Sequence, residues 1–114
     1  MADNCATFGW PPRECSPNWR GHWAKKAPAT KRYKLACWAL AREARLVAPA
    51  EGPINLRIEF VPPDRRPRDL DNMLASCKAM LDGIADALRV NDKRFTLALS
   101  VSQDIGGMVR VEIV

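Results

Sequence analysis

One run of alternating side chains, residues 54–60, constrains the fold of this chain more than any other segment. Its apolar positions are Ile54, Leu56, Ile58 and Phe60, and polar or charged residues separate them. Successive side chains of a β-strand point to opposite faces, so this alternation predicts a strand with one buried face. A strand of this kind requires a second layer of structure packed against its apolar side.

Two segments with helical periodicity would supply that layer. One helix is expected from Thr30, as its N-cap, to about Val47. Another is expected to begin at Asp71, as its N-cap, and to end near Leu88. Their apolar stripes are Tyr33, Cys37, Leu40, Ala44 and Val47 in the first helix, and Met73, Cys77, Leu81, Ile84 and Leu88 in the second.

The remaining segments complete a small sheet. Further strands are expected at residues 5–10, 95–101 and 108–114, and residues 13–30 are expected to form a long ordered loop. Gly106-Gly107 would join the last two strands as a hairpin. A chain of 114 residues has room for one domain. The order β-α-β-α-β-β therefore predicts a single α+β domain over residues 1–114, with two helices packed against one mixed sheet.

The positive charge is concentrated in the first half of the chain. Residues 1–50 hold nine lysines and arginines against three acids, whereas residues 51–114 hold nine against ten. Six basic residues and no acid lie between Arg20 and Lys34. This asymmetry suggests an anionic partner, nucleic acid before membrane, although a solvated basic helix face explains the charge equally well.

Several features argue against secretion and against zinc. No apolar run is long enough to cross a membrane, and the first residues lack the pattern of a signal peptide, so a soluble cytoplasmic protein is expected. The four cysteines form no C-x-x-C pair, and His22 is the one histidine. Cys37 and Cys77 are expected to be small buried hydrophobic residues without a disulfide. A structural role is favoured for His22 over a phosphate contact.

Three tryptophans near the start of the chain, Trp10, Trp19 and Trp23, alternate with basic residues. Aromatic rings among cations can stack on nucleobases, as they do in proteins that bind single strands. Tryptophans in such a loop more often pack it onto the sheet, and that interpretation is favoured.

The chemistry is expected between residues 64 and 92. Asp69 and Asp71 are two positions apart, so in extended backbone both carboxylates leave the same side. Like charges this close repel unless a cation lies between them, and hard divalent metals prefer carboxylate oxygens. If Asp92 folds back beside the pair, three carboxylates would hold Mg²⁺ or Mn²⁺. The simpler alternative is a solvated turn with a helix cap, but the neighbouring Arg65, Arg66, Pro67 and Arg68 favour a site that meets a polyanion.

Lys78 is a further candidate for the site. It follows Asp71 by seven residues, which is two helical turns, or roughly 10 Å along one side of a helix. Its side chain could therefore lean back toward a phosphate near the metal. The alternative is an ordinary surface lysine that pairs with Asp82 four residues later.

The segment Arg65-Arg66-Pro67-Arg68-Asp69-Leu70-Asp71-Asn72 resembles the acidic signature of RusA-type Holliday junction resolvases, small endonucleases common in phages and prophages. The likeness extends to Trp10-Pro11-Pro12, Ser16-Pro17-Asn18, the spacing of Lys78 to Asp82, and the turn at Asp92. It implies a homodimer that makes paired, Mg²⁺-dependent nicks across a four-way DNA junction.

Carried onto matching positions, the resemblance makes Asp69, Asp71 and Asp92 the metal ligands and Lys78 the active-site lysine. The chain departs from the family at two positions. Ala75 stands where the family often has its lysine, and Asn91 stands where it often has a further acid. Asp92 is therefore the sole candidate for the third carboxylate.

These observations lead to one expected function and three alternatives. The expected function is metal-assisted phosphodiester hydrolysis of branched DNA. The residues expected to contact DNA phosphates are Arg65, Arg66, Arg68, Lys25, Lys26, Lys31 and Arg32. The alternatives are a DNA-binding module without catalysis, a nuclease for flaps or forks, and an enzyme of small molecules. The last is disfavoured because no Gly-rich phosphate loop is visible.

Overall fold

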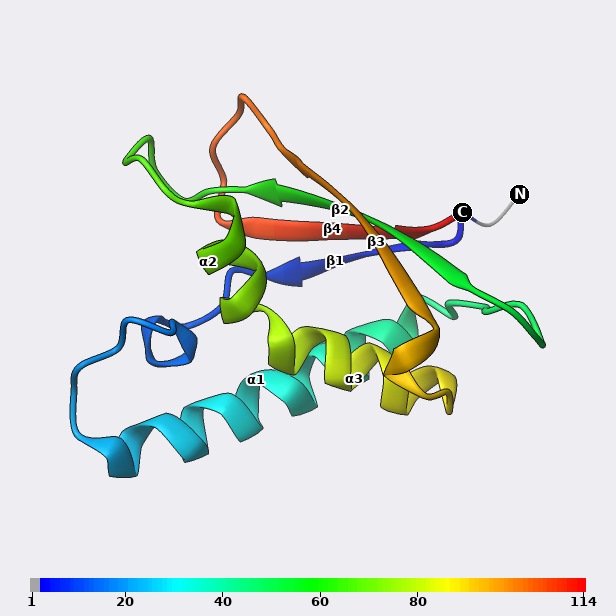
Figure 1. Ribbon diagram of the computed structural model, residues 1–114, viewed down its shortest axis with the longest axis horizontal. Coiled ribbons are helices and arrows are strands. Elements are labelled where there is room, and N and C mark those ends of the chain that lie inside the picture. The colour runs from blue at the N-terminus through cyan, green and yellow to red at the C-terminus, as the bar shows by residue number, and fades with distance from the viewer. Residues whose placement is uncertain (1–2) are drawn as a thin grey trace.

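A computed structural model describes residues 3–114 and places three α-helices against one side of a four-stranded sheet (Figure 1). In chain order the elements are β1 (Cys5–Gly9), the 3-10 turn η1 (Arg13–Cys15), α1 (Trp23–Glu43), β2 (Ile54–Val61), α2 (Leu70–Ser76), α3 (Lys78–Leu88), the 3-10 turn η2 (Asp92–Arg94), β3 (Phe95–Val101) and β4 (Met108–Ile113). The predicted α+β architecture with a mixed sheet is confirmed.

The strand order is β1-β4-β2-β3, so the predicted hairpin of the last two strands is wrong. β3 pairs in parallel with β2, and the α2–α3 segment forms the crossover that a parallel pair requires. β4 lies antiparallel between β1 and β2, which buries Val109 and Val111 completely. The glycine turn does not reverse the chain onto β3. Instead Gly106 and Gly107 donate their N–H groups to Pro62 and Val61 beyond the end of β2.

α1 begins at Trp23, seven residues before the expected N-cap. Pro28 lies in the second turn of this helix, where its ring removes one i→i−4 hydrogen bond without ending the helix. His22 is the N-cap, and its Nδ1 accepts a hydrogen bond of 3.1 Å from the N–H of Ala24. The structural role expected for His22 is therefore confirmed. Thr30 lies inside the helix and donates its hydroxyl to the carbonyl of Lys26.

The second predicted helix is divided in two at Cys77. That residue has φ −96° and ψ 10°, and its N–H donates to the carbonyl of Leu74, so α2 closes with a tight turn. α2 has seven residues and α3 has 11. The N-cap is Asp69 instead of Asp71, which places Asp71 in the first turn.

The core lies between the sheet and the helices. The alternating residues of β2 are completely buried, as expected, and they pack with Phe8, Val109 and Val111 from neighbouring strands. Cys37 and Cys77 are buried in the same cluster, as predicted, and all four cysteines are free thiols. Burial raises the pKa of each of these two thiols to about 12, so neither is reactive at neutral pH.

α1 and α3 approach most closely at Gly83. A Cβ atom at this position would lie 2.7 Å from the carbonyl oxygen of Lys34 and 3.0 Å from the backbone nitrogen of Trp38. We expect Gly83→Ala to lower the free energy of unfolding by about 1–3 kcal/mol, because helix backbones must separate to admit the methyl group. Urea denaturation measures this loss. Gly9→Ala is the control, since no atom lies within 4 Å of a Cβ there. Equal stability of the two variants would contradict close packing at Gly83.

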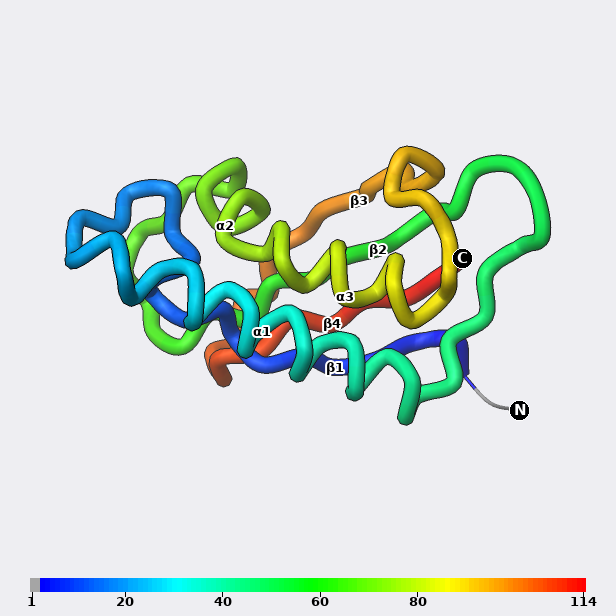
Figure 2. Tube along the Cα trace, turned by 90° about the horizontal axis from the view of Figure 1, so that it is seen from below, coloured from blue at the N-terminus to red at the C-terminus, as the bar shows by residue number. Residues whose placement is uncertain are grey.

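The helices leave β3 uncovered. α1 and α3 lie over β1, β4 and β2, whereas β3 lies beyond α3 (Figure 2). Phe95, Leu97, Leu99 and Val101 are in register with core residues of β2, so they share the helix side of the sheet. Leu97 is 39% exposed and Val101 is 47% exposed. We call these four residues the β3 apolar face.

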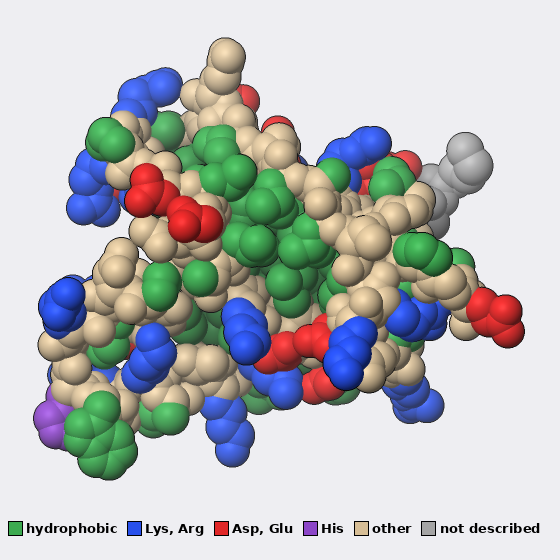
Figure 3. Space-filling view, viewed as in Figure 1, with side chains coloured by type: hydrophobic (Ala, Val, Ile, Leu, Met, Phe, Trp, Pro, Cys, Tyr) green, Lys and Arg blue, Asp and Glu red, His purple; other side chains and the backbone are tan. Residues whose placement is uncertain are grey.

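The surroundings of this face are also apolar. The space-filling view shows hydrophobic side chains gathered in the middle of the molecule, between β3 and the α2–α3 segment (Figure 3). β3 is the last strand of the sheet, and its outer edge has no partner among residues 3–114. An open strand edge beside an apolar surface is a place where another chain can bind.

Candidate functional site

The pair of aspartates lies where the chain enters α2. Asp69 has extended backbone, with φ −82° and ψ 135°, and both carboxylates are exposed. Asp69 makes no side-chain capping bond, although its Oδ2 accepts a hydrogen bond of 3.3 Å from Nδ2 of Asn72. Asp71 Oδ1 accepts only from the adjacent N–H of Asn72. Most oxygen lone pairs of this pair are therefore free to bind a cation or water.

The loop that delivers Asp69 is held by Asp64. Arg68 Nη1 lies 2.9 Å from Asp64 Oδ1, and Arg66 Nε lies 3.2 Å from Asp64 Oδ2. The hydrogen bond from Arg68, followed by the N–H and side chain of Arg66, holds the pKa of Asp64 well below its usual range. Sequence reasoning missed this role. The signal was an aspartate followed two and four residues later by arginine.

Arg68 was expected to contact DNA, but the structure holds it inside this loop. Its side chain is 18% exposed, and its guanidinium lies 5.6 Å from the centre of the Trp10 ring. It also donates to the carbonyl oxygens of Asp64 and Arg66. Arg68 therefore positions the loop through Nη1, whereas its Nε and Nη2 have no hydrogen-bond partner among residues 3–114 and Arg68 also lines the cleft described next. The side chain of Arg66 is 78% exposed and remains accessible, whereas Arg65 donates to the carbonyl of Gln103.

A cleft of about 480 Å³ opens beside Asp69. One wall comes from the loop after β1 and from η1, and the other comes from the start of α2. Its lining residues are Trp10, Pro11, Pro12, Arg13, Ser16, Asn18, Arg66, Pro67, Arg68, Asp69, Asn72, Met73 and Ser76. The volume is within the usual range for ligand sites. Because Arg13 and Arg66 line it beside Asp69, the cleft suits a phosphate group approaching a carboxylate-bound cation.

Asp92 does not join the pair within one chain, so that expectation is corrected. No group of three or more His, Cys, Asp or Glu side chains among residues 3–114 is close enough to hold a metal ion. Asp92 begins η2, at the opposite end of α3 from α2 (Figures 1 and 2). The 11 residues of α3 alone separate the two places by roughly 16 Å. Asp92 instead shares a shallow groove with Lys34, Asp82 and Asp86.

Lys78 is the first residue of α3 and is exposed. The break at Cys77 separates it from the helix that carries Asp71, so the two residues do not lie along one continuous helix. Among residues 3–114, Lys78 forms no ion pair within 4.0 Å, and the alternative pair with Asp82 is not formed. Asp86, which lies on α3 as Lys78 does, pairs instead with Lys34 of α1 at 3.1 Å.

The other residues expected to contact DNA, Lys25, Lys26, Lys31 and Arg32, are exposed on α1. Lys26 also donates to the carbonyl of Ser16 and so ties the helix to the loop that lines the cleft. The start of α1, η1 and α2 all lie at one end of the molecule (Figures 1 and 2). Of the helices in the described part of the chain, none is long and apolar enough to span a membrane.

Comparisons with known proteins provide no function. No family model matches the chain. A protein of Xylella fastidiosa that carries the description "Uncharacterized protein" is 45% identical over 92 residues, which cover 78% of this chain. The matched region is 60% of that protein's length. Among solved structures, a 2C-methyl-D-erythritol-2,4-cyclodiphosphate synthase bound to CDP gives a TM-score of 0.33 at 19% identity, over 90% of this chain and 59% of the other. This TM-score is too low to indicate a shared fold or function.

Proposed function

We propose that this chain is a metal-dependent endodeoxyribonuclease of the RusA type, which cuts four-way DNA junctions by paired phosphodiester hydrolysis in a bacterial cytoplasm. The observation that carries the proposal is the exposed pair Asp69 and Asp71, whose oxygens are mostly uncommitted, with Asp69 lining a cleft together with Arg13 and Arg66. A solvated turn with a helix cap would not require the second wall of the cleft, which Trp10, Pro11 and Pro12 help to form. The likeness of both segments to the resolvase signature supports the same activity.

The donor set at α2 fits a hard divalent ion. Mg²⁺ is usually held by one or two carboxylates, several waters and the phosphates of its substrate. Asp69 and Asp71 would supply the carboxylates, and Asn72 holds Asp69 in place. When bound, Mg²⁺ or Mn²⁺ would polarise the scissile phosphate and lower the pKa of an attacking water. Arg13 and Arg66 would hold the phosphates on either side, and Lys78 would lean toward the same strand from the start of α3.

The third carboxylate would come from a second copy of the chain. η2 lies at the beginning of β3 and α2 lies toward its end (Figure 1). The seven residues of β3 span about 23 Å. A two-fold axis through the middle of this strand would exchange its two ends, and so would place Asp92 of each chain near Asp69 and Asp71 of the other. Each dimer would then have two complete sites.

The β3 apolar face supports a dimer of this kind. Leu97 and Val101 are exposed on the helix side of the sheet, Phe95 and Leu99 pack partly against the core, and the strand edge beside them is open. Covering this face would remove exposed apolar surface and would bury the edge. A symmetric dimer also suits a four-way junction, because two sites at a fixed separation can nick two strands in a paired manner.

A cleavage assay tests the proposed function. A synthetic four-way junction, a replication fork and a plain duplex of equal length are incubated with the protein at one salt concentration, with and without Mg²⁺. We expect paired nicks near the branch point of the junction, little nicking of the duplex, and none without metal. Binding without nicking in Mg²⁺ or Mn²⁺ would support the DNA-binding module instead. Faster nicking of forks than of four-way junctions would indicate a different DNA substrate for the same metal-dependent hydrolysis.

A further inference from the structure

Trp23, the first residue of α1, stands almost free of the rest of the protein. Its side chain is 81% exposed, whereas Trp10 packs edge-on against Phe60 at 6.3 Å and Trp19 is half-buried. The expected packing of the tryptophans onto the sheet is therefore confirmed for Trp10 and is wrong for Trp23, while Trp19 packs against Arg13 and Gly21 of its own segment. A ring exposed to this degree contributes little to the core.

The exposed ring is nevertheless held in a defined place. The His22 ring stacks beneath it, with centroids 5.8 Å apart and planes 22° from parallel. His22 is itself fixed as the N-cap of α1 by the hydrogen bond that it accepts from Ala24. The approach to the helix is also fixed, because the backbone of Gly21 lies directly on the Trp19 ring, where even a Cβ atom would collide. One face of Trp23 is thus supported and the other remains open.

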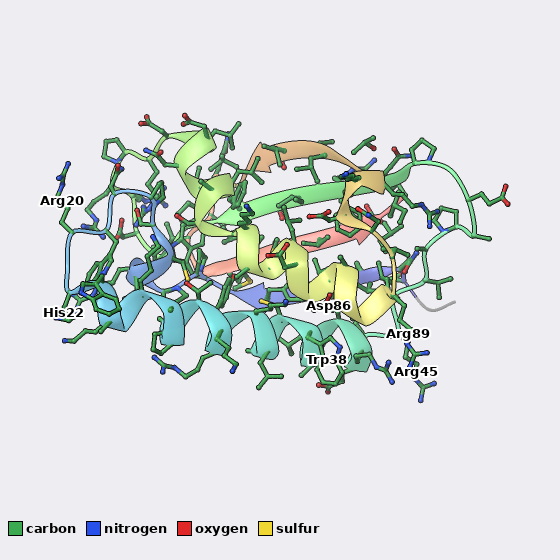
Figure 4. The ribbon with its side chains drawn as sticks, turned by 60° about the horizontal axis from the view of Figure 1, so that its bottom comes forward. Arg20, His22, Trp38, Arg45, Asp86 and Arg89 are labelled. Atoms are coloured by element: carbon green, nitrogen blue, oxygen red, sulfur yellow. The ribbon has the colours of Figure 1, made fainter. Side chains whose placement is uncertain are left out.

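The charged side chains close to Trp23 in sequence are all basic, which favours an anionic partner. Arg20, Lys25 and Lys26 lie within three residues of Trp23, and no acid occurs between Glu14 and Glu43. His22 and Arg20 mark this end of α1 in Figure 4, and in Figure 3 several basic side chains lie on the same side of the molecule as the histidine, which is purple. A nucleic acid offers both groups that such a surface binds, a flat base for the ring and phosphates for the cations.

Position links this surface to the candidate site. The start of α1 and the start of α2 lie at the same end of the molecule (Figures 1 and 2). The Arg13-lined cleft is bounded there by α2 and by the segment that precedes α1. We infer that Trp23, stacked on His22, is a platform for an unpaired nucleobase of a DNA strand that runs from the aspartates through the cleft. This inference rests on the proposed function, because it takes DNA as the ligand. It adds that the protein recognises unstacked bases, which branched DNA exposes and a continuous duplex does not.

A binding experiment tests the inference without relying on cleavage. Fluorescence anisotropy, at one salt concentration and without divalent metal, measures the affinity of the full chain for a 20-nucleotide single strand, a four-way junction and a duplex. We expect Trp23→Ala to weaken binding of the single strand and the junction roughly 10-fold, the usual loss for one base stacked on an aromatic ring. Duplex binding should change less than about 2-fold, and Trp23→Phe should restore most of the affinity.

The matched control is Trp38→Ala, which removes a tryptophan from a later turn of the same helix (Figure 4). Trp38 is 38% exposed and lies against Arg42, away from the cleft. This variant should bind all three DNAs as the wild type does. The platform would be overturned by a Trp23→Ala variant that binds all three DNAs normally or loses all three equally, even if the protein nicks junctions. A protein that never nicks but shows the selective loss would retain the platform without the nuclease. Failure of the wild type to bind any of the three would overturn both.

Discussion

Replacing Asp71 with asparagine is expected to abolish Mg²⁺-dependent nicking of a four-way junction while DNA binding is retained. The variant keeps the shape of the side chain and loses the charge that would hold the metal. Because Asp71 is exposed and accepts only the neighbouring N–H, the fold should not change. We expect the nicking rate to fall by more than about 100-fold, because replacing residues that only orient metal ligands already costs about 10–100-fold. Single-turnover nicking and anisotropy measure the two properties.

Asp104→Asn is the matched control for this variant. Asp104 is an exposed aspartate in the loop before β4, and it forms no ion pair within 4.0 Å among residues 3–114. Its replacement removes the same charge from the surface and should leave nicking unchanged. Cleavage by Asp71→Asn at a rate close to that of the control would exclude Asp71 from the reaction. In that case Asp71 would have only a structural role at the start of α2.

A charge on the β3 apolar face should separate the dimer and stop cleavage together. Leu97→Asp places a carboxylate in the middle of this face, where a partner chain would have to bury it. We expect association to weaken by roughly 30-fold or more, as for the loss of a central contact in an interface. Light scattering across a dilution series measures the mass. Nicking should decline in parallel with the dimer, because a single chain lacks the third carboxylate.

Ala98→Asp serves as the comparison for this surface. Ala98 is the next residue of β3 and is exposed on the opposite side of the sheet, so it receives the same charge away from the proposed contact. This variant should remain dimeric and active. A Leu97→Asp variant that is monomeric and still nicks junctions at the wild-type rate would show that one chain is sufficient. A wild-type protein that is monomeric at all concentrations would remove the dimer altogether.

The strands and their buried faces could be predicted because alternation depends only on local sequence. The residues of β2 are buried as their pattern indicated, and the stripes that include Cys37 and Cys77 form the helix side of the core. The start of α1 was misplaced because residues 13–30 were expected to be a loop with Thr30 as the N-cap of the helix, whereas the helix includes Pro28 and begins at Trp23. The pairing of β3 with β2 depends on contacts distant in sequence, which a turn motif does not reveal.

The candidate site was only partly predictable for the same reason. The exposure of Asp69 and Asp71 follows from their place between a strand end and a helix start, which the sequence indicated. The position of Asp92 depends on the direction in which α3 runs, and the chain carries it away from the pair. The loop role of Arg68 was not predicted, because the ion pair of its Nη1 with Asp64 depends on how the loop folds before Asp69.

The central claim is that each active site combines Asp69 and Asp71 of one chain with Asp92 of another. Mixing Asp71→Asn with Asp92→Asn tests it directly, with the two chains co-expressed under different tags. Each variant alone should be inactive. A mixed dimer would have one intact site, so random pairing should restore about a quarter of the wild-type nicking rate. If the mixture stays as inactive as either variant alone while mixed dimers are shown to form, the carboxylates are not shared between chains and this account is wrong.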